Sequence, residues 1–191
     1  MMAGRTGRGG AAAPPLNRVT KNAGLNRFVW DVGHSSGLGA PPGRYQARLS
    51  VGAETRTVPF VVRIDPRLAA EGLTEADLRY QFEHNTRLRA MNAEVGAVVQ
   101  RVRAAETRLR AASGRAAADS LARVQAIAAK LLTEPVRYGK PGLQAHISYL
   151  AGMHTRVDQK IGKDSIDRAV VLRRELDAVK AEVDRALGAT R

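Results

Sequence analysis

Residues 74–114, TEADLRYQFEHNTRLRAMNAEVGAVVQRVRAAETRLRAASG, are the part of the chain that decides the fold. Their apolar side chains recur mainly at steps of three and four residues, which is the period of a helix with one buried face. Thr74 is a favourable N-cap, and Asp77 stands where it can complete a capping box. Gly114 predicts the end of this helix. The expected buried stripe consists of Leu78, Phe82, Leu88, Met91, Val95, Val98, Val102 and Leu109.

Three more helical stripes follow toward the C-terminus. The first is expected over about residues 116–132, the second from Pro141, because proline suits the first turn, and the third from Asp164 or Ser165. Helices of this length are marginal alone, and short connections favour antiparallel neighbours, so they are expected to share one core. The expected buried residues are Leu121, Val124, Ile127 and Leu131, then Leu143, Ile147, Leu150 and Val157, then Ile166, Ala169, Leu172, Leu176, Val179, Val183 and Leu187.

Upstream of the long helix the apolar period changes to two, which is the pattern of a β-strand. Three strands are expected within residues 23–66. Gly52 and Ala53 separate the second strand from the third, and glycine at the first central position suits a type II′ turn. This turn places Tyr45 opposite Phe60. The alternating apolar residues are Phe28, Trp30 and Val32, then Tyr45, Ala47, Leu49 and Val51, then Val58, Phe60, Val62 and Ile64.

The composition agrees with a mainly aliphatic core. Hydrophobic residues make up 44% of the 191 residues and aromatic residues only 4%, so Leu, Val, Ile and Ala must fill it. We therefore predict an α+β fold, in which a small antiparallel β unit, residues 23–66, precedes an antiparallel bundle of about four helices, residues 74–188. Residues 1–22 are rich in Gly, Ala, Arg and Pro, and are expected to form a disordered basic tail.

The formal net charge of +13 raises the hypothesis of a polyanion partner, because phosphate neutralisation by Lys and Arg dominates binding to nucleic acids. The alternative is a solvated surface with scattered arginines. No aromatic stacking platform accompanies the arginines, so binding to nucleic acid is expected to be weak and non-specific. The densest group comprises Arg101, Arg103, Arg108, Arg110 and Arg115.

Several kinds of site and segment are not expected. The chain has no cysteine, which excludes structural disulfides, thiolate catalysis and cysteine-ligated zinc. No apolar run approaches the ~18 to 20 residues of a membrane-spanning helix. Residues 1–15 lack the apolar core of a signal peptide. These features leave the cellular compartment open.

Six short strings carry a resemblance to a known family. They are GLNRFVWD at residues 24–31, PGRY at 42–45, DPR at 65–67, YGKPGLQ at 138–144, HISYL at 146–150 and DQKIGKD at 158–164. These strings resemble the C-terminal region of bacterial exported proteins that contain a sortilin-like β-propeller of neuraminidase-type repeats and are often labelled glycosyl hydrolases.

The resemblance spans about residues 24–188 and implies a partial immunoglobulin-like β unit followed by a helical tail. It also implies a periplasmic or extracellular protein, and a β-propeller domain as partner in cis or in trans. The family's propeller, its signal peptide and the strands expected ahead of Leu25 have no counterpart in this sequence. Any glycosidase activity would belong to the propeller, so we expect the chain to be a fragment or a separately encoded relative of the tail.

Three polar patterns resemble reactive sites but have simpler interpretations. Residues 31–36, DVGHSS, contain the residue types of a hydrolytic triad, yet a triad needs a rigid scaffold and an oxyanion hole, so we interpret them as turn residues. His146 and His154 could share a helix face, but a metal would need further ligands. GKDS at 162–165 lacks the earlier glycine of a phosphate loop, because Val157 occupies that position, and is expected to begin a helix.

These patterns together predict a non-catalytic structural or interaction module that uses no cofactor and no metal. Polyanion binding through the arginines is the alternative, and a hydrolase centred on residues 31–36 is the third hypothesis. Residues expected to take part in interactions are Trp30, Asp31, Tyr45, Tyr138, His146 and Tyr149.

Overall fold

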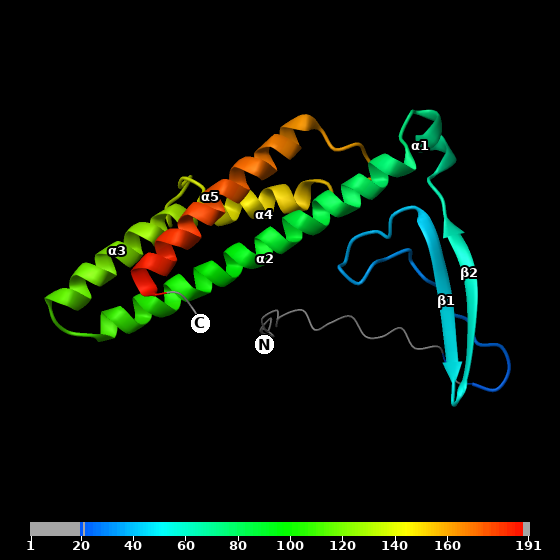
Figure 1. Cartoon of the computed structure of the whole chain (residues 1–191), viewed down its shortest axis with the longest axis horizontal. Helices are drawn as coiled ribbons and strands as arrows, with labels where there is room; N and C mark the ends of the chain where they lie inside the picture. Colours follow the sequence, from blue (N-terminus) through cyan, green and yellow to red (C-terminus); the bar gives the residue numbers. More distant parts are fainter. Residues whose placement is uncertain (1–19, 21, 189–191) are drawn as a thin grey trace, which may run out of the picture. The chain divides into compact units, whose positions relative to one another are not determined.

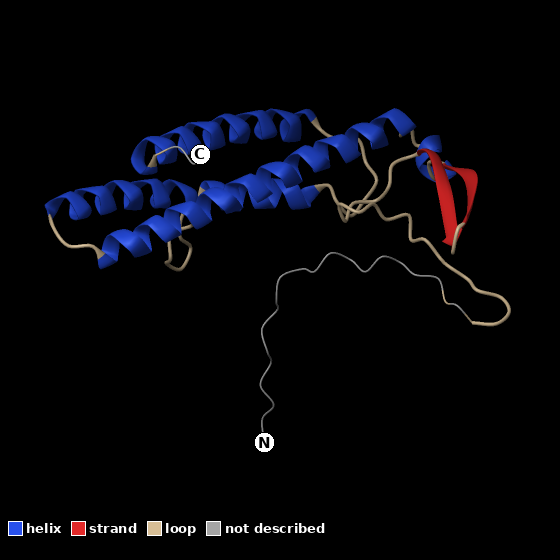
Figure 2. Ribbon diagram, turned by 60° about the horizontal axis from the view of Figure 1, so that its bottom comes forward, coloured by secondary structure: helices blue, strands red, loops and turns tan. Residues whose placement is uncertain are grey.

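A computed structural model describes residue 20 and residues 22–188 and confirms the predicted α+β class. A two-stranded antiparallel sheet precedes the helices, as Figures 1 and 2 show. The elements are β1 (Gly43–Val51), β2 (Glu54–Val62), α1 (Pro66–Ala70), α2 (Glu75–Ala111), α3 (Arg115–Leu131), α4 (Leu143–Met153) and α5 (Lys163–Leu187). The chain divides into two compact units between Ala40 and Pro41.

The predicted first strand does not form. In the first unit, Phe28, Trp30 and Val32 lie in irregular backbone, where one isolated antiparallel bridge joins Gly33 to Gly39. Val32 has a positive φ of 58°, which is incompatible with a strand and is costly for a β-branched residue. The predicted disordered tail, residues 1–22, lies outside the described residues except at positions 20 and 22.

The hairpin of β1 and β2 has the predicted register. Tyr45 pairs with Phe60, and their rings stack with centroids 5.8 Å apart. Gly52 has a φ of 58° at the first central position of the turn, while Ala53 does not have a positive φ, as a type II′ turn requires. The Tyr45 hydroxyl donates to the Pro41 carbonyl at 2.6 Å.

Side-chain caps set the starts of α1 and α2. Asp65 accepts a hydrogen bond from the backbone N–H of Arg67 at 2.9 Å and begins the short helix α1, which the sequence pattern did not predict. Thr74 and Asp77 form the predicted capping box, with N–H to side-chain distances of 3.1 and 3.0 Å. α2 ends at Ala111, so Gly114 is the N-cap position of α3 instead of the end of α2.

The four long helices lie in three rows. α3 returns along the C-terminal part of α2 and α4 along its N-terminal part, so α3 and α4 follow one another end to end (Figure 1). Ser148 of α4 donates to Asn92 of α2 at 2.7 Å. α5 then runs parallel to α2. Its direction is shown by Glu94 pairing with Arg173 and Arg101 pairing with Asp184.

The break between α3 and α4 depends on two glycines of the YGKPG string. A side-chain carbon at Gly139 would lie 2.3 Å from the Glu134 carbonyl oxygen, and one at Gly142 would lie 2.4 Å from the Leu132 carbonyl carbon. Neither position has room for a larger residue, because the neighbouring atoms belong to the backbone. α4 consequently begins at Leu143, two residues later than the expected start at Pro141.

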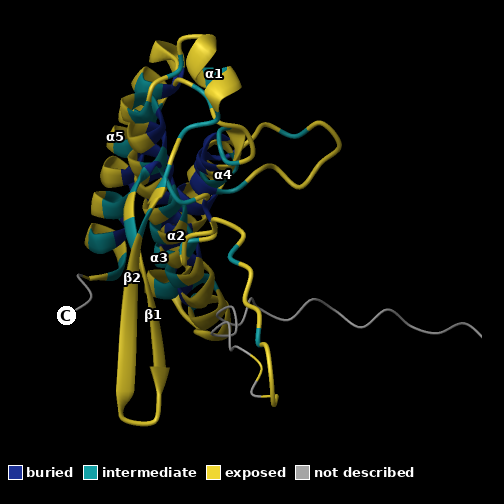
Figure 3. Cartoon of the chain, turned by 90° about the vertical axis from the view of Figure 1, so that its right-hand side faces the viewer, coloured by how far each residue is buried: buried dark blue, intermediate teal, exposed yellow. Residues whose placement is uncertain are grey.

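The core lies between the three rows and is aliphatic (Figure 3). The predicted stripe of α2 is buried except at Phe82 and Leu109, which are partly buried. The expectation for Val157 is wrong. Its side chain is 66% exposed because α4 ends at Met153, before the helix can carry Val157 onto the buried face. The fully buried large residues are Leu88, Val95, Val102, Val124, Leu131, Ile147, Leu172, Leu176 and Val183.

Ion pairs hold α5 in register with its neighbours. Glu94 of α2 accepts from Arg173 at 2.5 Å and from Lys180, and these two hydrogen bonds, Arg173 first, lower the pKa of Glu94 to about 2. Lys130 of α3 contacts Glu182 of α5 at 2.7 Å. α5 is therefore fixed by charges on both sides of its buried stripe.

The structure of the bundle predicts that substitutions at two adjacent residues of α5 will differ sharply in their effect on stability. Leu172 is fully buried, so Leu172→Ala should lower the free energy of unfolding by about 2–5 kcal/mol, through lost burial and the remaining cavity. Val171, which is 41% exposed, supplies the control, and Val171→Ala should cost less than about 1 kcal/mol. Urea denaturation measures both values. Equal losses would contradict the described orientation of α5.

Candidate functional site

A cluster of buried polar side chains lies where the α4–α5 connection meets the first half of α2. Gln81, His84 and Asn85 of α2 and Ser165 of α5 are each at most 6% exposed. They occupy core positions of their helices that aliphatic side chains fill elsewhere in the bundle. Since buried polar groups are normally hydrogen-bonded, their partners show what the cluster does.

Two of these side chains bind the backbone of the connection. Gln81 donates its amide N–H to the carbonyls of His154 at 2.9 Å and Val157 at 2.8 Å, and accepts from the backbone N–H of Gln159 at 3.1 Å. Asn85 donates to the same His154 carbonyl at 2.7 Å. Its own Oδ1 is buried without a hydrogen-bond partner among the described residues. Gln81 and Asn85 therefore fix the path of the loop that reverses the chain.

Ser165 lies between two imidazoles. Its Oγ is 3.0 Å from His154 Nε2 and 3.3 Å from His84 Nε2, while His154 Nδ1 is 2.7 Å from the Gln159 amide nitrogen. One consistent order has the Gln159 amide donating to His154, His154 donating to Ser165, and the Ser165 hydroxyl donating to His84. Burial, then the charge of Arg87, then His154 lower the pKa of His84, which favours its neutral form.

The serine and histidine contacts do not form a hydrolytic site of the usual kind. An amide, Gln159, orients His154 where a triad has a carboxylate, so the imidazole gains no charge stabilisation from it. In the hydrogen-bond order above, His154 donates to Ser165, and the imidazole that accepts from the hydroxyl, His84, has no carboxylate partner among the described residues. The hydroxyl is also buried, with Ser165 only 4% exposed. This geometry is that of a structural network.

Hollows open at several places on the described surface of the bundle. A groove of about 620 Å³ between α2 and α5 is lined by Leu88, Met91, Ala169 and His84, among others. A hollow of about 330 Å³ between α4 and α5 is lined by His146, Tyr149 and Ser165, among others.

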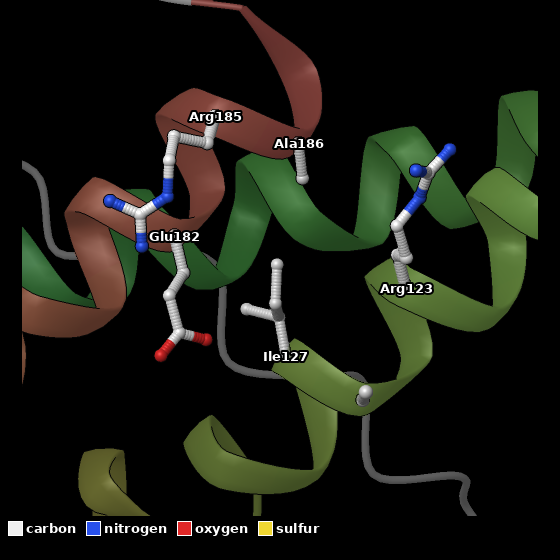
Figure 4. Close-up of a pocket in the computed structure, with 6 residues that line it drawn as sticks. Arg123, Ile127, Glu182, Arg185 and Ala186 are labelled. Carbon is white, nitrogen blue, oxygen red and sulfur yellow. The ribbon is translucent and has the colours of Figure 1, made fainter.

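A third hollow, of about 460 Å³, lies between α3 and α5 (Figure 4). Arg123 projects from α3, and Arg185 and Glu182 project from α5. Glu182 is already paired with Lys130, so the cations around this hollow are only partly neutralised within the described chain.

The residues predicted for interactions occupy several different elements. His146 and Tyr149 line the same hollow on α4, whereas Tyr138 is 90% exposed on the α3–α4 loop and Tyr45 lies in β1. In the first unit, Trp30 donates its indole N–H to the Gly33 carbonyl at 2.9 Å. Asp31, also in that unit, accepts from the Gly33 N–H at 3.0 Å.

Of the sequence patterns that resemble reactive sites, residues 31–36 form a local turn and residues 162–165 begin a helix, as predicted. In residues 31–36, His34 Nδ1 lies 2.8 Å from the Ser36 hydroxyl, two residues away. Gly162 directly precedes α5, and Lys163 pairs with Asp167 at 2.5 Å on the first turns of that helix.

The histidine pair does not share a helix face. His146 is on α4, but His154 stands one residue beyond the end of that helix and joins the buried network. In the described part of the chain, no three side chains of the metal-ligating kinds lie together.

The predicted cationic group is divided by the structure. Arg101 is half-buried and paired with Asp184 at 2.9 Å, whereas the others are exposed near the α2–α3 turn. The exposed members are Arg103, Arg108, Arg110 and Arg115.

Sequence reasoning missed Gln81, His84, Asn85 and Ser165. One indication was present, because the predicted stripe of α2 jumps from Phe82 to Leu88 and leaves a full turn of the buried face to polar residues. Polar residues at buried helical positions indicate a partner that needs hydrogen bonds. The partner itself, the loop backbone from 154 to 159, could not be identified from spacing alone.

The sequence matches no protein-family model, no curated protein and no solved structure. None of the helices described is long and apolar enough to cross a membrane.

The buried network predicts a pH dependence of stability. Because the pKa of folded His84 lies below its unfolded value of about 6.5, the unfolded chain binds the proton first as the pH falls. Neutral His84 therefore makes its full contribution to the stability of the folded state above about pH 6.5. This contribution is lost as the pH falls from about 6.5 through the lower pKa of the folded state. We expect a smaller free energy of unfolding at about pH 5.5 than at about pH 7.5. His84→Gln should reduce this difference.

Chemical denaturation at the two pH values measures this effect. His146→Gln is the matched control, because His146 is exposed on α4. That variant should keep the pH dependence of the original chain. An unchanged pH dependence in His84→Gln would contradict the role given to the buried imidazole.

Proposed function

We propose that this chain is a non-catalytic interaction module that docks onto another protein through its β-hairpin. The observation that carries the proposal is the exposure of apolar side chains on a sheet that has two strands in the described part of the chain. Leu49 is 53%, Val51 68% and Val58 62% exposed. A two-stranded hairpin is at best marginally stable alone, so added strands or a covering surface would stabilise it.

The polar contacts within the helical bundle are consistent with this proposal. Its buried polar side chains bind its own loop, and its serine and histidine contacts lack the orienting carboxylate of a hydrolytic triad. We further propose a β-propeller domain as the partner, in cis or in trans. The six strings that resemble the tail of sortilin-like propeller proteins support this choice of partner.

Paired substitutions on the hairpin test the docking. Leu49 and Val58 lie on one face of the hairpin, so Leu49→Lys with Val58→Lys should weaken binding to a purified propeller domain of the resembled family by about tenfold or more. Thr55→Lys with Thr57→Lys places the same charges on the other face and should not weaken binding. Calorimetric titration measures affinity, and circular dichroism checks that the bundle is folded.

Two results would count against the proposal. Equal binding by both double variants would exclude docking through this face of the hairpin. A failure of the original chain to bind would exclude the propeller as the partner.

Polyanion binding is the second candidate, supported by the exposed arginines near the α2–α3 turn. Because the contacts would be purely electrostatic, binding to a labelled DNA duplex should be lost by ~200 mM salt. The double variant Arg108→Ala with Arg110→Ala should weaken DNA binding at low salt. Sequence-selective binding that persists at that salt concentration would contradict the expectation of weak, non-specific contacts.

A further inference from the structure

The two outer edges of the hairpin are not equivalent, because Pro59 lies in β2. Val51 and Glu54 close a two-residue turn, and a closing pair of this kind exchanges two backbone hydrogen bonds. Hydrogen-bonded and non-hydrogen-bonded pairs alternate from that point. Pro59, opposite Gln46, therefore falls in a non-hydrogen-bonded pair, with its nitrogen turned away from β1.

The outer edge of β2 is consequently interrupted. Proline has no N–H to donate, and its ring occupies the place where an incoming strand would approach. Proline on an edge strand is one of the ways in which proteins prevent pairing with another chain.

The outer edge of β1 has no such interruption. The residues whose backbone groups point outward are those of the non-hydrogen-bonded pairs, namely Arg44, Gln46, Arg48 and Ser50. Each has both an N–H and a C=O group. None of these outward groups is hydrogen-bonded to another described residue. β1 therefore presents an uninterrupted row of donors and acceptors.

The charged side chains of β1 are all positive. Arg44 and Arg48 are four residues apart and lie on one face of the strand, and no acidic residue occurs from Gly43 to Ala53. Neither arginine forms an ion pair with a described residue. The other face of β1 carries Leu49 and Val51, both exposed. The edge thus combines free backbone groups, two cations on one face and apolar side chains on the other.

We propose that the outer edge of β1 binds an extended acidic segment of a partner protein as a third strand. This proposal rests on the proposed function and specifies it. The segment would place acidic residues opposite Arg44 and Arg48 and apolar residues on the Leu49 face, because alternate side chains of a strand point to opposite faces. A second copy of the chain fits less well, since it would bring more arginines against these two.

Two matched proline variants test which edge is used. Gln46→Pro removes an outward N–H from β1 but no hydrogen bond of the hairpin, and Thr57→Pro does the same on the outer edge of β2. The probe is a synthetic ten-residue peptide of alternating Glu and Val, labelled with a fluorophore, and a Lys and Val peptide is its control. Fluorescence anisotropy with the full chain measures affinity.

We expect the Glu peptide to bind and the Lys peptide to bind at least about tenfold more weakly. Gln46→Pro should weaken binding of the Glu peptide by about tenfold or more, and Thr57→Pro should weaken its binding by less than about twofold. Arg48→Glu leaves one cation, Arg44, and one anion on this face, so it should abolish the preference between the two peptides. This last variant contains no proline, so the proposal stays testable if a proline variant fails to fold.

Each remaining result would overturn the proposal. Equal effects of the two proline variants, or equal binding of the two peptides, would exclude a charge-selective strand on β1. A dimer seen by ultracentrifugation and abolished by Gln46→Pro would assign the edge to a second copy. If a propeller domain binds and Gln46→Pro leaves its affinity unchanged, this inference fails while docking by the hairpin face stands.

Discussion

The hydrogen bonds from Gln81 and Asn85 to the α4–α5 connection are the interactions on which the rest of the bundle depends. α4 runs toward the beginning of α2, so the chain must reverse there before α5 can follow α2 in parallel. A reversal beside a core leaves carbonyl groups without partners unless side chains supply them. Gln81 and Asn85 bind the carbonyls of His154 and Val157, and α5 can then begin at Lys163 against the same face of α2.

The length of α2 explains why the second row is made of two helices. Its 37 residues extend about 55 Å, whereas α3 has 17 residues and α4 has 11. Neither short helix could cover the stripe of α2 alone. The tight loop with Gly139 and Gly142 joins them nearly end to end, and together they bury a stripe that runs from Leu88 to Ala105.

The sequence predicted those parts of the fold that depend on local periodicity. The hairpin register followed from the Gly52–Ala53 turn, and the α2 start followed from Thr74 and Asp77, because both features involve residues only a few positions apart. The prediction of a first strand was wrong, because the alternation at Phe28, Trp30 and Val32 does not show whether a neighbouring strand exists to pair with that segment. The predicted burial of Val157 was wrong because the apolar periodicity continues past the residue at which α4 ends.

The candidate site was less predictable than the fold. His146 and Tyr149 were recognised and do share a hollow, but the buried polar cluster joins residues about 80 positions apart, such as His84 and Ser165. Spacing along a sequence carries no information about such a pair. The non-equivalence of the hairpin edges, in contrast, was already contained in the position of Pro59, and needed only the register to be interpreted.

The parallel arrangement of α2 and α5 also has a consequence for the order of folding. Contacts between them join residues 79 to 86 positions apart, as at Arg173 and Lys180 with Glu94, whereas α2 and α3 meet through a turn of three residues, 112–114. Closing a long loop costs more entropy than closing a short one, so local helix pairs form first. The contacts of α5 with α2 are therefore expected to form after those of α3 with α2.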